Sequence, residues 1–183
     1  MRPRLILVGS LLLLATTCRA ERATDIHVSL APGERDTFVF QPVAAWAELV
    51  DIPGLRRELR VSLSSYPADC GALSLPTDDH VLVTVTVIVP NGRSLGRASY
   101  PWPGEGSLER STSALALPTV RRGSGSAVLP AGGELLLRRV ELGPRGGIEG
   151  LLAFESSGDG DHPATHLRGP FSARICSPDR RSR

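Results

Sequence analysis

Apolar and polar side chains alternate with a period of two in several short segments of the chain. The alternation is cleanest in residues 26–30, 59–64 and 171–175, where every second residue is apolar. Because successive side chains of a strand point to opposite faces of a sheet, this pattern predicts strands with one buried face. Residues 36–43 and 81–89 are apolar on both sides, and the second segment has five valines on one face. Such strands are typical of the centre of a packed sheet.

Turn residues separate these segments. Residues 90–92, Pro-Asn-Gly, end the valine-rich segment, and Asn-Gly readily takes the positive φ angles of a tight turn. We therefore expect a hairpin whose return strand is residues 95–100. A second hairpin is expected between residues 134–142 and 148–155. Residues 44–50 are the one segment with helix-like spacing, and Pro53 and Gly54 would end a helix there within about two turns.

The rest of the chain shapes the domain prediction. Residues 101–133 are rich in Pro, Gly, Ser and Ala, and we expect a long excursion with one short strand at residues 114–117. Residues 177–183 form a basic tail that we expect to fray. About eight short strands with almost no helical period predict an all-β fold. The expected architecture is an antiparallel β-sandwich, of jelly-roll or related type, that occupies residues 21–176 as a single domain.

Residues 1–20 have the three parts of a secretory signal peptide. These are a basic start with Arg2 and Arg4, an apolar stretch from Leu5 to about Thr17, and a small-residue exit that ends at Ala20. The apolar stretch is shorter than the roughly 20 residues that span a bilayer, and no later segment is longer, so no transmembrane segment is predicted. We expect a secreted, extracellular protein. The alternatives are an uncleaved anchor, a buried helix, or a lipoprotein attached at Cys18.

Composition excludes several classes of function. The chain has 21 basic and 19 acidic residues, and every basic one is Arg. Three arginines lie in residues 1–20, whereas all acidic residues lie after residue 20, so the mature chain has one more acidic than basic residue. Bulk charge therefore gives no support to nucleic-acid binding. The absence of lysine excludes a lysine Schiff base and a Walker-type phosphate loop.

The cysteines predict one disulfide. Cys18 leaves with the signal peptide, so Cys70 and Cys176 are the only cysteines of the mature chain. An oxidising compartment favours their pairing, and a pair of buried free thiols is the alternative. Neither residue lies in a Cys-x-x-Cys motif, so redox catalysis is not indicated.

The start of the mature chain resembles a known family of sandwich domains. Residues 27–40 read His-Val-Ser-Leu-Ala-Pro-Gly-Glu-Arg-Asp-Thr-Phe-Val-Phe, and residues 59–64 read Leu-Arg-Val-Ser-Leu-Ser. This succession of a strand, a Pro-Gly-Glu turn, an aromatic strand and a Leu-x-Val-x-Leu strand resembles the start of pre-peptidase C-terminal-type domains. The resemblance implies a non-catalytic extracellular module that binds surfaces or polymers.

The densest group of candidate metal ligands is Asp159, Asp161 and His162, with His166 four residues further on. Asp-x-Asp supplies the hard oxygen ligands that calcium prefers, and two histidines with a carboxylate are a zinc-binding set. The EF-hand and His-Glu-x-x-His spacings are absent, so a solvated loop between two strands is the favoured interpretation. His80, after two aspartates, would join such a site only if the fold brought it beside His162. No bound cofactor is predicted.

Tyr100 and Trp102 give the best binding hypothesis in the sequence. With their flanking prolines they form Tyr-Pro-Trp-Pro-Gly, a stiff segment that would present two rings to a sugar or a protein. The alternative is that Trp102 plugs one end of the core.

Pairs of arginines raise a third class of function, a precursor cut in the secretory pathway. Of these pairs, Arg121 and Arg122 lie in a segment whose composition predicts flexibility. No Gly-x-Ser-x-Gly motif and no familiar order of Ser, His and Asp is present. The sequence therefore favours a secreted, non-catalytic module that binds an extracellular protein or glycan. A metal-assisted hydrolase that uses His80, Asp161, His162 or His166 and a dibasic precursor are the alternatives.

Overall fold

The computed structural model of the chain describes residues 26–28, 38–68, 70, 80–103, 113–122, 125–128, 132–143, 145–156 and 165–176. These residues form eleven strands. The strands are β1 (Ile26–Val28), β2 (Phe38–Phe40), β3 (Ala44–Ile52), β4 (Arg56–Ser64), β5 (Val81–Pro90), β6 (Ser99–Trp102), β7 (Leu115–Arg122), β8 (Gly125–Val128), β9 (Gly132–Val140), β10 (Gly147–Ser156) and β11 (Thr165–Ile175).

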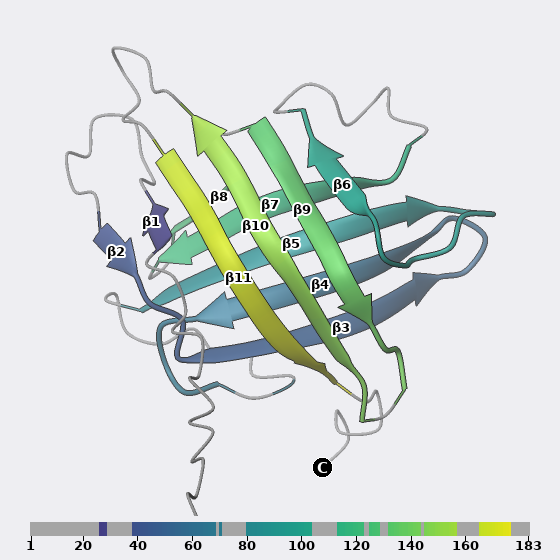
Figure 1. Cartoon of the computed structure of the whole chain (residues 1–183), viewed down its shortest axis with the longest axis horizontal. Coiled ribbons are helices and arrows are strands. Elements are labelled where there is room, and N and C mark those ends of the chain that lie inside the picture. The colour runs from purple at the N-terminus through teal and green to yellow at the C-terminus, as the bar shows by residue number, and fades with distance from the viewer. Residues whose placement is uncertain are drawn as a thin grey trace, which may run out of the picture.

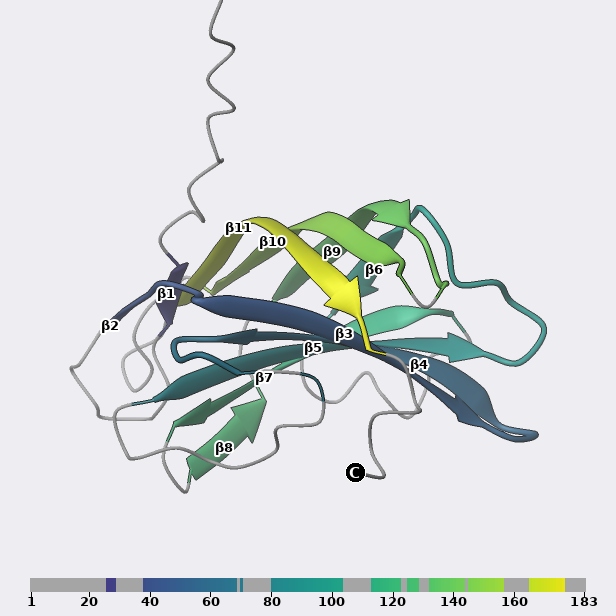
Figure 2. The ribbon, with the colours of Figure 1, turned by 90° about the horizontal axis from the view of Figure 1, so that it is seen from below.

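All the strands belong to one sheet. Its order is β6-β9-β10-β11-β3-β4-β5-β7-β8, with β1 paired to β11 and β2 paired to β1. The sheet curls so that β6, β9, β10 and β11 lie over β3, β4, β5 and β7, and the strands of the two halves cross steeply (Figures 1 and 2). The molecule is therefore nearly barrel-shaped.

The expected fold is confirmed in class and corrected in architecture. The chain is all-β and has one disulfide, as the sequence predicts. A two-sheet antiparallel sandwich is not what the strands form, because β11 and β3 pair in parallel at Arg174 with Trp46 and at Ile175 with Ala47. This pair gives both strands hydrogen-bonding partners at an edge that a sandwich would leave open, and it makes the sheet mixed and continuous.

The core lies between the two halves of the sheet. All five valines on one face of β5 are buried, and Phe40, Trp102 and Phe154 are among the largest side chains that are fully enclosed. The valine-rich segment is therefore a central strand, as its composition predicts. Its opposite face carries Thr84 and Thr86, which are partly exposed.

The predicted helix-like segment at residues 44–50 is a strand instead. β3 pairs with β4 along its whole length, from Ala44 opposite Ser64 to Ile52 opposite Arg56. Its alternate residues Ala47 and Leu49 pack in or against the core. Pairing with β4 and β11 outweighs the helix-like spacing of this segment, which is a weak local signal.

The Asn-Gly turn forms, but the hairpin predicted after it does not. Gly92 has a φ of 83°, and Arg93 N donates to Pro90 O at 3.2 Å. β6 then pairs with β9 in the other half of the sheet, because β4 and β7 already occupy both edges of β5. The hairpin of β9 and β10 is confirmed, with Ile148 opposite Val140 next to the turn.

Two other predictions gave too little strand. The excursion expected at residues 101–133 contains β7, which extends to Arg122, and β8, which the sequence did not predict. β11 begins at Thr165, six residues before the predicted start of that strand. No described segment is a helix long and apolar enough to cross a membrane.

Cys70 and Cys176 form the predicted disulfide across 106 residues of sequence. Cys176 follows β11 directly, and its N–H donates to Ala47 O at 2.8 Å. The disulfide therefore lies at the junction where the parallel pair joins the two halves of the sheet. A disulfide fits an extracellular or other oxidising location.

Candidate functional site

The outer face of β3, β4, β5 and β7, opposite the core, forms a groove of about 370 Å³. We call it the outer groove. Alternation along β5 places Leu82, Thr84, Thr86 and Ile88 in the groove, because each follows a buried valine whose side chain points to the core. The residues of its floor lie opposite one another on the four neighbouring strands. The groove-facing residues used below are Trp46, Arg56, Glu58, Arg60, Ser62, Thr84, Thr86, Thr119 and Arg121.

A row of three hydroxyl groups crosses the middle of the outer groove. Ser62, Thr84 and Thr119 lie opposite one another on β4, β5 and β7. The Ser62 Oγ and Thr84 Oγ1 atoms share a hydrogen bond of 3.2 Å, and Thr119 Oγ1 donates to Thr84 O at 3.1 Å. These contacts fix the positions of the three oxygens.

Trp46 closes the β3 end of the hydroxyl row. It lies opposite Ser62, and only 4% of its surface is exposed although it faces away from the core.

At one end of the groove, Arg121 lies opposite Leu82. Its positive charge acts on Tyr66, whose pKa is nevertheless raised above 10 because burial disfavours the phenolate. Tyr66 is therefore neutral at neutral pH.

A carboxylate held between two arginines occupies the other end of the groove. Arg56, Glu58 and Arg60 are alternate residues of β4, so their side chains share one face. Arg56 Nε donates to Glu58 Oε1 at 2.8 Å, and Arg60 Nη2 and Nε donate to Oε2 at 2.7 and 3.2 Å. The Glu58 side chain is 4% exposed, whereas those of Arg56 and Arg60 are 41% and 44% exposed. The buried charge is thus paired while both cations reach solvent.

The pair of arginines keeps Glu58 ionised. Burial alone would raise the pKa of this carboxyl, but the hydrogen bonds and charges of Arg60 and Arg56 outweigh burial and hold the pKa below 4.5. The folded pKa is therefore lower than the unfolded one. Stability from this site is complete above the unfolded pKa and is lost as the pH falls through the folded pKa.

This sign predicts an acid dependence that Glu58→Gln removes. We expect wild type to lose more free energy of unfolding than Glu58→Gln when the pH falls from about 6 to about 3, because only wild type binds an extra proton at this position on unfolding. Urea unfolding at both pH values measures the difference. Glu141→Gln, which removes an exposed carboxylate, is the control. Equal acid losses for wild type and Glu58→Gln would contradict the pairing.

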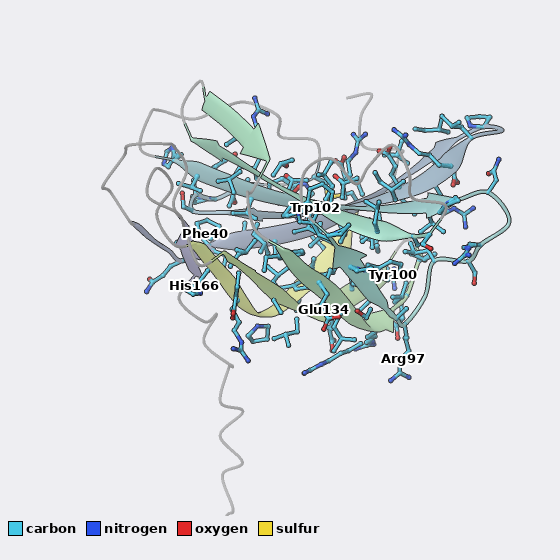
Figure 3. All side chains as sticks on the ribbon, turned by 90° about the horizontal axis from the view of Figure 1, so that it is seen from above. Phe40, Arg97, Tyr100, Trp102, Glu134 and His166 are labelled. Atoms are coloured by element: carbon cyan, nitrogen blue, oxygen red, sulfur yellow. A yellow bond between two sulfur atoms is a disulfide. The ribbon has the colours of Figure 1, made fainter. Side chains whose placement is uncertain are left out.

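The binding hypothesis for Tyr100 and Trp102 required exposed rings, and the structure buries both. Tyr100 is 3% exposed and Trp102 is 1% exposed, and both belong to the core cluster (Figure 3). β6 alternates, so Pro101 faces solvent while the two rings face inward. The Tyr100 hydroxyl donates to Gly96 O at 2.9 Å and accepts from Gly96 N at 3.1 Å. Trp102 thus has the core position that was the alternative interpretation.

The predicted metal cluster is only partly described. Asp159, Asp161 and His162 lie outside the described residues. His166 is exposed and lies in β11, opposite His27 of β1 and Glu155 of β10, rather than in the expected loop (Figure 3). His80 precedes β5, and its ring centroid is 4.9 Å from that of Tyr66. Within the described ranges, no three His, Cys, Asp or Glu residues are arranged to hold a metal ion.

The prediction that Arg121 and Arg122 are flexible is also wrong. Both lie in β7, opposite Leu82 and Val81 of β5 and opposite Ser126 and Gly125 of β8. A segment paired on both sides does not offer a protease the extended, separate backbone that cleavage requires.

A second hollow, of about 580 Å³, lies where β11 diverges from the start of β3. Its lining includes Val43, Phe171 and Arg138. Phe171 packs against Gly150, where a Cβ would lie 2.7 Å from the ring. This hollow lacks the ordered hydroxyl row and the paired arginines of the outer groove, so the outer groove is the stronger candidate.

Comparisons with protein-family models, curated proteins and solved structures found no match to this chain. The geometry of the outer groove therefore carries the functional interpretation. Apart from Arg121, which the sequence offered only as a cleavage site, its residues were not among the sequence candidates, yet one signal was visible. Residues 56–60 read Arg-Arg-Glu-Leu-Arg, which places Arg56, Glu58 and Arg60 on one face once the strand is begun at residue 56 rather than 59.

Proposed function

We propose that the mature chain is a secreted binding module without catalytic activity, and that its ligand is an extracellular or cell-surface protein or glycan. The observation that carries this proposal is the outer groove, where a hydroxyl row and two arginines are held in place by their own hydrogen bonds. A ligand that binds side chains already ordered loses less of its affinity to their immobilisation. The groove is thus suited to recognition.

The chemistry of the groove favours binding over catalysis. Glu58 is fully engaged by Arg56 and Arg60, and its lowered pKa keeps it deprotonated near neutral pH. A general acid or base works best with a pKa near the operating pH, so Glu58 is poorly suited to that task. The described lining of the groove contains no histidine or cysteine.

Two features support an extracellular setting. Residues 1–20 have the organisation of a signal peptide, and the Cys70–Cys176 disulfide fits an oxidising compartment. The resemblance of residues 27–64 to sandwich domains that bind surfaces or polymers points the same way. The proposed function therefore joins the export signal with a preformed polar groove.

Blocking the groove tests this proposal. Thr86 lies in the groove, opposite Arg60 on β4 and Leu117 on β7, and Thr86→Trp would fill the groove with a residue that is favourable in strands. Arrays of extracellular glycans and purified receptor ectodomains are probed with the mature wild type and with this variant. We expect Thr86→Trp to lose the ligand that wild type binds.

A matched control uses the other half of the sheet. Leu136→Trp places the same bulky ring on the outer face of β9, opposite Leu151, and is expected to leave binding unchanged. Ligand binding that survives in Thr86→Trp would contradict the proposed site. Turnover of the bound ligand, detected by mass spectrometry after incubation, would contradict the non-catalytic function.

A further inference from the structure

We infer that the ligand of the outer groove is an acidic glycan, an oligosaccharide that carries carboxylate or sulfate groups. This inference rests on the proposed function and names the chemical class of its ligand. It follows from three properties of the groove: unused guanidinium donors, an excess of positive charge, and hydroxyl groups placed between the charges.

The two arginines beside Glu58 retain donors for a second anion. A guanidinium group has five N–H donors, and Arg60 uses Nε and Nη2 on Glu58 whereas Arg56 uses Nε. Their partly exposed side chains leave the remaining N–H groups available to a ligand. Guanidinium groups bind carboxylate and sulfate-like oxygens through paired, charge-assisted hydrogen bonds. Glu58 thus orients the two guanidinium groups and leaves some of their N–H donors available for a ligand.

Charge along the groove favours an anion. Arg56, Arg60 and Arg121 line it together with the carboxylates Glu48 and Glu58, so one positive charge is in excess. Among the described residues, no carboxylate is paired with Arg121. By contrast, Arg139 on the outer face of the other half is bonded to both Glu141 and Glu149. The positive excess is therefore a property of the groove and not of every arginine on the surface.

The spacing of the charges indicates an oligomer. Arg60 lies opposite Thr86 of β5, and Arg121 lies opposite Leu82, which is four residues from Thr86 along the same strand. Arg60 and Arg121 are themselves two strands apart, on β4 and β7. Strand geometry places the two Cα positions about 16 Å apart. A ligand that meets both cations must extend over more than one sugar unit.

The hydroxyl row lies between these charges. Ser62, Thr84 and Thr119 occupy the register row between those of Arg60 and Arg121, and hydroxyl groups both donate and accept hydrogen bonds. Sugar hydroxyls need partners of this kind. The described lining places these hydroxyl groups beside the free N–H donors of the arginines, so neighbouring positions along the groove offer partners to both hydroxyl and acidic groups. A glycan that carries acidic groups has both kinds of group along its length.

Binding measurements with oligosaccharides of one backbone in neutral, carboxylated and sulfated forms test this inference. Calorimetry with the mature wild type should show at least about 10-fold tighter binding of an acidic form than of the neutral one, a preference that weakens as salt is added. Tighter binding of the carboxylated form or of the sulfated form identifies the source of the charge, and either result supports the inference.

Arginine variants locate the effect. Arg121→Gln and Arg60→Gln are each expected to weaken binding of the acidic form by about 10-fold. Arg57→Gln is the matched control, because Arg57 pairs with Asp51 outside the groove. Arg60→Lys keeps the charge but loses the paired hydrogen bonds, and we expect a loss of affinity close to that of Arg60→Gln. If Arg60→Gln does not fold, Arg121→Gln and Arg60→Lys still decide the outcome.

The failures of the two proposals are distinguishable. Equal binding of the neutral and acidic forms would overturn the acidic glycan and leave the groove as a binding site. The same holds if the ligand is a protein or a single-stranded nucleic acid whose binding is lost in Thr86→Trp. If an acidic glycan binds Arg121→Gln, Arg60→Lys and Thr86→Trp as tightly as it binds wild type, both proposals are overturned.

Discussion

Replacement of Trp102 by alanine is expected to lower the free energy of unfolding by about 3–5 kcal/mol, the usual cost of removing a large buried aromatic side chain. The indole is 1% exposed and lies opposite Gly133, so the residue paired with it on β9 has no side chain to fill the space. Urea unfolding followed by circular dichroism measures the change.

Trp102→Phe separates the ring from its polar atom. Among the described residues, Trp102 Nε1 has no hydrogen-bond partner, so phenylalanine loses volume but no hydrogen bond. We expect Trp102→Phe to be clearly more stable than Trp102→Ala. If Trp102→Ala unfolded at the wild-type urea concentration, the ring would not be part of the core.

Removal of the disulfide is expected to have an effect of similar size. A cross-link between residues 106 apart restricts the unfolded chain enough to contribute about 5 kcal/mol in the loop-entropy relation. Cys70→Ala/Cys176→Ala should therefore unfold at a much lower urea concentration than the oxidised wild type. Reduced wild type should match the double variant.

The single variant Cys176→Ala controls for local packing at the β11 junction. It should lose about as much stability as the double variant, because either change opens the same loop. Equal stability of oxidised wild type and the double variant would show that the cross-link does not constrain the unfolded chain as this relation requires.

Local patterns in the sequence predict which residues enter the core, but they do not predict which strands become neighbours. The alternation in β4 and the valines of β5 correctly identify the buried faces, since a period of two is a property of each strand by itself. The partner of β6 was not predicted because an Asn-Gly turn reverses the chain but does not determine which strand the next segment pairs with. Likewise, the spacing of residues 44–50 favours a helix locally, and only the ladders to β4 and β11 make the segment a strand.

The same limit explains why the outer groove was not found from the sequence. Ser62, Thr84 and Thr119 are ordinary polar residues on the solvent side of three separate strands. They become a row only when β4, β5 and β7 are adjacent and in register. The cysteine pair was predictable because two cysteines in one mature chain leave a single intramolecular pairing.

The parallel pair of β11 with β3 means that the fold is completed by the last strand to be made. Synthesis runs from the N-terminus, so a nascent chain presents β3, β4 and β5 before β9, β10 and β11 exist. Until then the valine face of β5 stays open to water and to other chains, a state prone to aggregation. Closure of the core therefore waits until β11 has been made, and the unfinished chain is the form most exposed to association with other chains.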